Sequence, residues 1–153
     1  MRSLRFLLTS AVLALLALAL AARAAEPSLY ERGNLVAWCI VPFDAKRRGP
    51  EERAARLERL GLRRLAYDWR AEHVPTFDAE MVALKKRGIE LTAWWFPTAM
   101  GPEARVILDV IDRHGVKPQL WVMGAGEPKP GEADAHVTAE VARLAPICEE
   151  AGK

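Results

Sequence analysis

Cysteine is scarce in this sequence, and several familiar catalytic signatures are missing. The 153 residues include two cysteines, Cys39 and Cys148, which are too few for a disulfide-stapled scaffold. They could pair in an oxidising compartment, but both fall on apolar patterns, so we expect two buried thiols. No H-E-x-x-H, G-x-S-x-G or Cys-x-x-Cys motif occurs, and the sequence therefore gives no sign of the enzyme classes that these motifs mark.

An excess of basic charge is also lacking once residues 1–24 are set aside. The whole sequence has 22 basic and 20 acidic residues, but Arg2, Arg5 and Arg23 fall within that first segment. The remainder has 19 basic and 20 acidic residues, a net charge of −1. The cluster at residues 85–87 ends a helix pattern, where cations suit the helix dipole. We therefore expect no nucleic-acid partner.

Long apolar runs are confined to the N-terminus. Residues 6–22 are mostly apolar and follow a short basic start without acids, while Ala22 and Ala24 suit a cut after residue 24. We predict that residues 1–24 are a signal peptide that exports the protein to the periplasm or beyond, with no stable membrane association after cleavage. An uncleaved membrane anchor is the alternative, because seventeen residues lie near the lower limit for a span.

An internal repeat is the strongest signal in the rest of the chain. Gly61, Gly88 and Gly115 are spaced by 27 residues, and each follows a helix pattern at the position where a left-handed residue ends a helix. Strand-like runs follow the three glycines, and an earlier one precedes the first helix: residues 35–41, 64–69, 90–96 and 119–123. The chain therefore alternates strands and helices.

This alternation predicts an α/β fold with parallel strands. We count about four βα units, whereas a complete (β/α)8 TIM barrel needs about 250 residues. We therefore predict a partial (β/α)8 TIM barrel, with residues 25–33 as a linker and residues 34–153 as the N-terminal half of the barrel. A complete small doubly wound domain is the alternative, although Pro42-Phe43-Asp44 follows the first strand in place of a Gly-rich phosphate loop.

Aromatic residues recur near the strand ends. Six residues beyond the three repeat glycines stand Tyr67, Trp94 and Trp121, and we expect them to share the inner face of the barrel. Because indole faces stack well on sugar rings, we predict Trp38, Trp69, Trp94 and Trp121 as substrate-binding residues. Filling of the hydrophobic core is the alternative for each of them.

Polar residues near the carboxyl ends of the strands are the catalytic candidates, since barrel active sites form on that face. We predict Asp68, His73 and Glu127 as catalytic residues, because carboxylates and imidazole move protons or bind a divalent metal. A solvated loop that carries an arginine–carboxylate pair is the alternative at residues 68–73. His114 and His136 fall within helix patterns and are expected to be structural or exposed.

Four segments carry a resemblance to a known family: residues 34–42 (NLVAWCIVP), 65–73 (LAYDWRAEH), 91–97 (LTAWWFP) and 119–124 (QLWVMG). They resemble secreted xylose isomerase-like TIM-barrel proteins, the sugar phosphate isomerases and epimerases of the AP-endonuclease-like superfamily. The resemblance covers the N-terminal half of that barrel. It implies a sugar-like substrate and a divalent metal cation, with metal ligands mostly on the later strands. His73 lies where some relatives place a histidine after the second strand, and Glu127 follows the fourth.

Two kinds of function follow from these observations. The first is an exported relative of sugar isomerases and epimerases, truncated and inactive alone, with a homodimer as one way to close the half-barrel. The chemistry implied by the resemblance is metal-assisted proton transfer between adjacent sugar carbons. The second is a carbohydrate-binding protein without catalysis, in which the stacking surfaces are Trp38, Trp69, Trp94, Trp95 and Trp121. A glycoside hydrolase with Asp68 and Glu127 as its carboxylate pair is a third hypothesis.

Overall fold

The computed structural model describes residues 29–152 of the chain. The predicted signal peptide, residues 1–24, and the first part of the predicted linker lie outside the described residues. Arg32–Lys153 forms one compact unit. Within the described part of the chain, no helix is long and apolar enough to cross a membrane.

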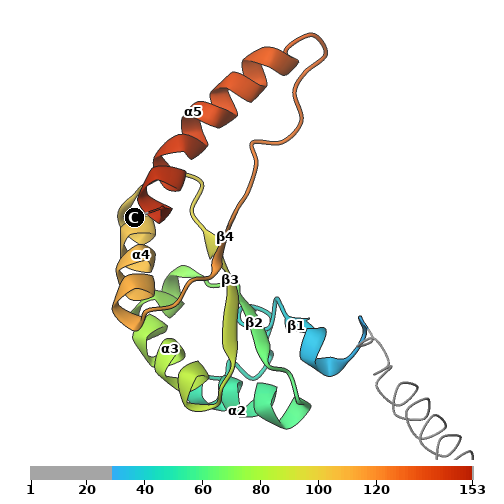
Figure 1. Ribbon diagram of the computed structural model, residues 1–153, viewed down its shortest axis with the longest axis vertical. Helices are drawn as coiled ribbons and strands as arrows, with labels where there is room; N and C mark the ends of the chain where they lie inside the picture. Colours follow the sequence, from blue (N-terminus) through green and yellow to red (C-terminus); the bar gives the residue numbers. More distant parts are fainter. Residues whose placement is uncertain (1–28, 153) are drawn as a thin grey trace, which may run out of the picture. The chain divides into compact units, whose positions relative to one another are not determined.

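The described chain alternates strands and helices, as the sequence predicts. Its elements are η1 (Arg32–Asn34), β1 (Val36–Ala37), α2 (Pro50–Leu60), β2 (Arg64–Tyr67), η2 (Ala71–Thr76), α3 (Phe77–Lys86), β3 (Glu90–Phe96), α4 (Pro102–His114), β4 (Gln119–Val122) and α5 (Ala133–Ala151). The four strands pair in parallel in the order β1-β2-β3-β4 (Figure 1). The predicted α/β class with parallel strands is confirmed.

The repeat glycines end their helices as expected. Gly61 and Gly115 cap α2 and α4 in the left-handed conformation, with φ angles of 70° and 63°. Gly88 follows α3 with a φ of 61°. Since a residue with a side chain is strained at such angles, glycine is favoured at each of these turns into the next strand.

The first strand is much shorter than predicted. The apolar run at residues 35–41 predicts a strand of that length, but β1 covers only Val36–Ala37. Two residues further on, Cys39 has a φ angle of 57°, which is incompatible with extended backbone. A left-handed residue therefore ends β1 within the apolar run.

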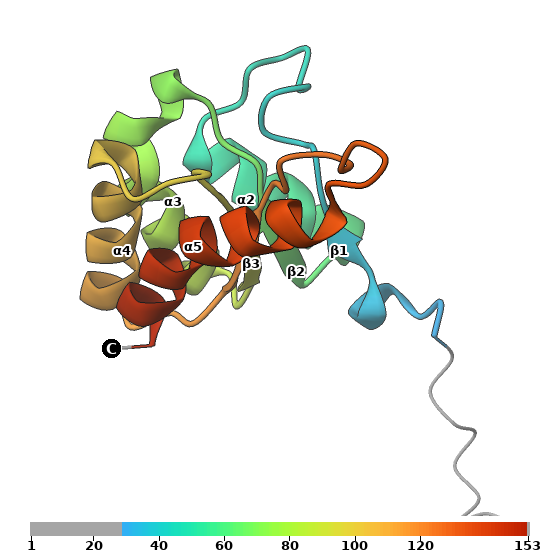
Figure 2. The same ribbon diagram turned by 90° about the horizontal axis from the view of Figure 1, so that it is seen from above.

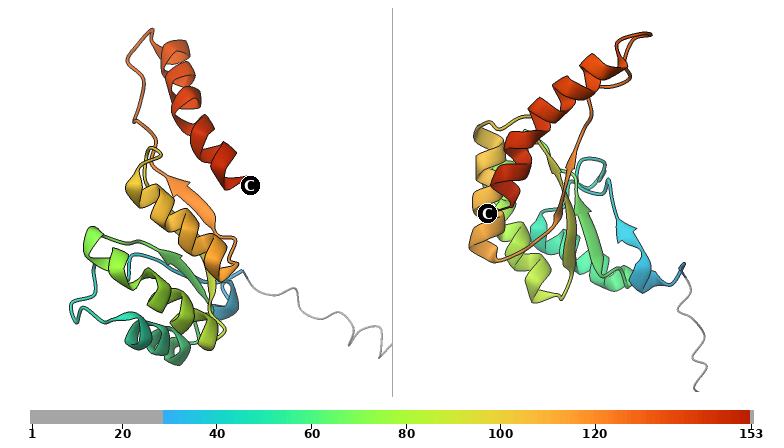
Figure 3. Two further views of the ribbon diagram at one scale, coloured as in Figure 1. Left: turned by 90° about the vertical axis from the view of Figure 1, so that its left-hand side faces the viewer. Right: turned by 45° about the horizontal axis from the view of Figure 1, so that its top comes forward.

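The core lies between the sheet and three helices. Helices α2, α3 and α4 lie side by side along one face of the sheet (Figures 2 and 3). The strands contribute Ala37, Leu65, Tyr67, Leu91, Trp94 and Phe96 to this core, and the helices contribute Ala54, Leu57, Met81, Leu84, Ile107 and Val110, among others. The Trp94 ring lies edge-on to the rings of Tyr67 and Phe77, with centroids 5.3 and 5.0 Å away.

An irregularity in β3 corrects the predicted face of one aromatic residue. Leu65 pairs with Leu91 but Ala66 pairs with Ala93, so Thr92 is an extra residue in β3. An inserted residue moves every later side chain to the opposite face, which the spacing of the repeat glycines does not reveal. Tyr67 and Trp94 consequently face the helices, whereas Trp121 does not.

The final helix contacts the core only near its end. Of the side chains of α5, only Ile147 is buried, while Val137 and Val141 are more than half exposed. Cys148 is exposed and Cys39 is half-buried, and both are free thiols. The expectation of two buried thiols is therefore wrong for Cys148, because the outward face of α5 lacks a partner among the described residues.

Candidate functional site

Four side chains gather near the carboxyl end of the sheet, on the face opposite the helices. Successive side chains of a strand alternate between faces. Ala37, Tyr67 and Trp94 belong to the helix-side core, so the residues that follow them, Trp38, Asp68 and Trp95, point the other way. Trp121 pairs in register with Trp95 and shares that face. We call Trp38, Trp95 and Trp121 the tryptophan cluster.

The rings of the tryptophan cluster contact one another. Trp38 stacks on Trp95, with centroids 6.3 Å apart and planes at 28°. Trp121 lies edge-on to both, at 6.0 Å from each. The side chain of Trp38 is 51% exposed, and Trp95 and Trp121 are half-buried. These three indoles form an accessible aromatic surface made from the first, third and fourth strand segments.

Small residues occupy the centre of the same face. Ala66 and Ala93 pair across β2 and β3, are each 1% exposed, and do not belong to the helix-side core. The small side chains of Ala66 on β2 and Ala93 on β3 leave room for the three indoles to converge. The small side chains at the centre of this face therefore make space for the tryptophan cluster.

Asp68 brings a carboxylate to this face. Its side chain is 9% exposed and accepts a hydrogen bond of 2.6 Å from Nη1 of Arg70. The Arg70 guanidinium also lies 5.9 Å from the ring centroid of Phe43, close enough for a cation–π contact. Burial and the Asp68 carboxylate raise the pKa of the Cys39 thiol, which is therefore protonated at neutral pH. Cys39 is thus a poor nucleophile.

Arg70 also connects Asp68 with the second predicted catalytic residue. The backbone N–H of Arg70 donates to Nδ1 of His73 over 2.9 Å. Burial lowers the pKa of His73, so the ring is neutral at pH 7 and carries its proton on Nε2. Asp68 and His73 are thus linked through Arg70. The alternative hypothesis, a solvated loop with an arginine–carboxylate pair, predicts the same contact between Arg70 and Asp68.

Glu127 lies elsewhere. It belongs to the segment between β4 and α5 and borders a separate cavity with Lys129 and His136. The structure does not join it to the Asp68–Arg70–His73 group. Among residues 29–152, no three His, Cys, Asp or Glu side chains gather where they could hold a metal ion. We therefore assign no metal ligand to the described side chains.

Two of the predicted substrate-binding tryptophans lie outside the cluster. Trp94 is 0% exposed within the core. Trp69 packs edge-on against Phe77, and its indole N–H donates to the carbonyl oxygen of Trp95 over 2.6 Å. The structure therefore brings together Trp38 and Trp121 but not Trp69 and Trp94. The cluster also contains Trp95, which the carbohydrate-binding hypothesis names but the repeat spacing does not, because the extra residue at Thr92 is invisible in the pattern.

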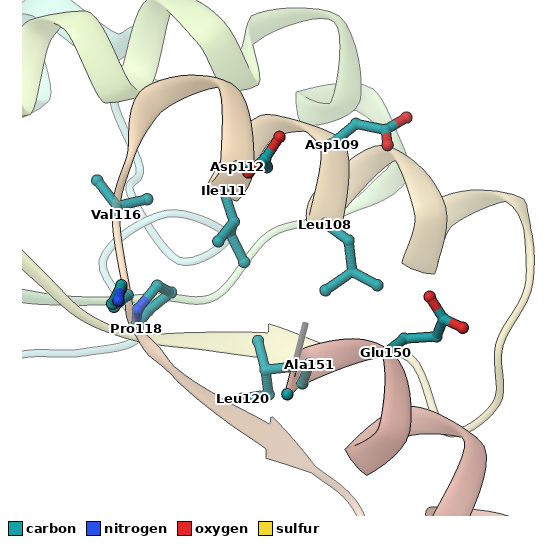
Figure 4. Close-up of a pocket in the computed structure, with 11 residues that line it drawn as sticks. Leu108, Asp109, Ile111, Asp112, Val116, Pro118, Leu120, Glu150 and Ala151 are labelled. Carbon is teal, nitrogen blue, oxygen red and sulfur yellow. The ribbon is translucent and has the colours of Figure 1, made fainter.

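A cavity of about 550 Å³ lies at the opposite end of the sheet (Figure 4). It is bounded by α4, the residues that lead into β4, and the end of α5. Leu108 and Ile111 face it from α4, and Leu120 faces it from β4. It contains none of the predicted site residues.

No protein-family model, curated protein or solved structure matches this chain.

Proposed function

We propose that this chain is a xylose isomerase-like half-barrel that binds a sugar-like small molecule over the tryptophan cluster. The observation that carries the proposal is the convergence of Trp38, Trp95 and Trp121 on one face of the sheet, beside Asp68. Barrel enzymes place their sites at this carboxyl end of the strands.

The strand order supports the barrel part of the proposal. A doubly wound sheet reverses its strand order and carries helices on both faces. Here the order is sequential, β1-β2-β3-β4, and α2, α3 and α4 lie on one face (Figure 3).

The chemistry of the face supports a sugar-like ligand. Indole rings provide flat apolar surfaces for the C–H faces of a sugar, while hydroxyl groups need donors and acceptors at the edge. Asp68 supplies carboxylate oxygens and Arg70 supplies guanidinium N–H groups beside the cluster. The buried indole N–H of Trp95 has no acceptor among the described residues.

A binding titration tests this proposal. The purified chain is titrated with a panel of neutral mono- and disaccharides by calorimetry. We expect saturable binding of at least one sugar, weakened about tenfold or more by Trp38→Ala, because one stacking contact is worth about 1 kcal/mol or more. Val82→Ala on α3, also an exposed apolar side chain, is the matched control and should leave binding unchanged. If no sugar binds, or both variants weaken binding equally, the proposal is wrong.

A second candidate function is sugar isomerisation or epimerisation, the activity implied by the family resemblance. The observation that favours it is the link from buried Asp68 through Arg70 to His73 at the strand ends. In that case His73→Ala should reduce turnover more than stability, while His114→Ala, which removes a contact of 2.7 Å with Asp78, should leave turnover unchanged. Sugar binding without turnover, in the presence of added divalent metals, would contradict isomerisation and favour carbohydrate binding without catalysis.

Export is part of the same proposal. The order of basic start, apolar run and Ala-x-Ala site in residues 1–24 supports it. Mass spectrometry of the secreted protein should find Ala25 at the N-terminus. An N-terminus at Met1 in a membrane-extracted protein would indicate an anchor instead.

A further inference from the structure

Helix α5 turns a partly charged face toward the rest of the described chain. The helix starts away from the sheet, after the long segment that follows β4, and runs back toward α4 (Figures 1 and 3). Near its carboxyl end, Ile147 is buried and Leu144 packs against the same core. Arg143 and Glu140 lie one and two turns nearer the amino end, on the same side of the helix as Ile147. This side of α5 is therefore apolar at its carboxyl end and charged in the middle.

Arg143 joins the segments that follow β3 and β4. Its Nη1 donates to the carbonyl oxygen of Thr98 over 2.7 Å, and its Nη2 donates to that of Met123 over 3.1 Å. Thr98 lies two residues beyond the end of β3, and Met123 directly follows β4. One guanidinium group on α5 therefore bridges the carboxyl ends of two neighbouring strands.

Glu140 holds the Arg143 side chain in this place. Its two carboxylate oxygens accept hydrogen bonds from Nε and Nη2 of Arg143, at 3.0 and 2.6 Å. One of these oxygens also accepts the backbone N–H of Ala125 over 3.3 Å, in the segment after β4. Hydrogen bonding to Arg143 keeps the pKa of the Glu140 carboxyl below its usual range, so the pair is charged at neutral pH. The Arg143 and Glu140 side chains are only 23% and 20% exposed, so water competes for these bonds less than at an open surface.

The bridged strand ends carry two members of the tryptophan cluster. Trp95 and Trp121 pair in register between β3 and β4, and their rings are 6.0 Å apart. The carbonyl oxygens that Arg143 contacts lie three residues after the first tryptophan and two residues after the second. The pairing of β3 with β4 ends one residue beyond these tryptophans. Arg143 therefore links the two segments just after the strand ladder stops.

We propose that Arg143 is a positioning residue for the tryptophan cluster: by joining the ends of β3 and β4, it holds the rings of Trp95 and Trp121 in the arrangement that a sugar contacts. The inference rests on the proposed sugar site and adds to it a residue that acts through the two rings. A ligand binds more tightly to a surface that is already ordered, because less conformational freedom is lost on binding. Loss of the bridge should therefore weaken binding without removing any ring from the cluster.

The test compares variants of the purified full chain by calorimetric titration with a sugar that binds the wild type. Arg143→Gln should weaken binding about fivefold or more, because the two strand ends lose their link. Arg143→Lys keeps the positive charge but lacks the guanidinium fork that reaches both carbonyl oxygens and Glu140, so it should not restore the affinity. Arg113→Gln is the matched control. It also removes an ion pair between two elements, with Asp78 of α3, but it lies near the carboxyl end of α4, away from these strand ends, and should leave the affinity within about twofold.

The indole N–H signals in nuclear magnetic resonance spectra of the sugar-free protein give a second measurement. The signals of Trp95 and Trp121 should shift in Arg143→Gln but not in Arg113→Gln, and that of Trp94, in the helix-side core, should stay in place in both. Unchanged affinity or unchanged Trp95 and Trp121 signals in Arg143→Gln would overturn the inference, as would full rescue by Arg143→Lys or an equal loss of affinity in Arg113→Gln. If no sugar binds the wild type, the proposed function is wrong, and the sugar-free spectra decide separately whether Arg143 positions the two rings.

Discussion

The sheet carries aromatic side chains on both faces, and the two sets differ in what surrounds them. On the helix side, Tyr67 and Trp94 are fully buried and contact Phe77 in edge-on pairs. On the other face, Trp38 and Trp121 contact Trp95 but remain half-buried or exposed. Tryptophan thus fills the core on one face of the sheet and forms an accessible aromatic surface on the other.

The largest difference between the faces should appear in stability. Trp94→Ala empties a fully buried site and should lower the free energy of unfolding by about 3–5 kcal/mol. Trp121→Ala removes a half-buried ring and should lower it by about 1 kcal/mol. Urea denaturation of both variants measures the two losses. Equal losses would mean that both faces are core, and the distinction would fail.

A pH effect on stability should also come from the helix side. Burial raises the pKa of Glu80 from 4.5 to about 7 in the folded chain. The folded state therefore binds more protons than the unfolded state between these values, so stability should fall as pH rises from about 4.5 to 7, by roughly 1–3 kcal/mol. Denaturation midpoints across this range test the direction.

Two variants identify the group behind this pH effect. Glu80→Gln should remove the fall in stability, because the titrating group is gone, and should leave the rise that His73 contributes up to about pH 6.5, since burial lowers its pKa. Glu90→Gln, at an exposed side chain, should leave it unchanged. A dependence of the same size in Glu80→Gln would assign the effect to another group.

A smaller effect should arise where the two faces meet. The Trp69 indole packs on the helix side but donates to the carbonyl oxygen of Trp95, a member of the tryptophan cluster. Trp69→Phe removes this donor and keeps an aromatic ring, so the free energy of unfolding should fall by about 0.5–1.5 kcal/mol. Thermal denaturation measures the loss. No change in stability would show that this hydrogen bond contributes nothing.

Much of the fold could be predicted because its signals are local. Gly61, Gly88 and Gly115 mark the helix ends, and the runs between them have the periodicity of strands and helices. The assignment of faces could not be predicted, because it depends on the extra residue at Thr92, whose only signature is the pairing of β2 with β3. Because of this extra residue, the side chain of Trp95, and not that of Trp94, lies in the tryptophan cluster.

The sequence predicts only the part of the candidate site whose residues are close together in the chain. Asp68 and His73 lie close in sequence and are linked by Arg70, so their proximity is local. The position of Glu127 depends on the course of the long segment between β4 and α5, and no periodic pattern in the sequence predicts that course.

The assignment of a ligand to only one face can be tested by nuclear magnetic resonance of the five indole N–H groups during a titration with a sugar that binds. We predict that the signals of Trp38, Trp95 and Trp121 shift in a saturable manner, while those of Trp69 and Trp94 shift little or not at all. Shifts confined to Trp69 and Trp94, or equal shifts at all five, would contradict a sugar site on the face opposite the helices.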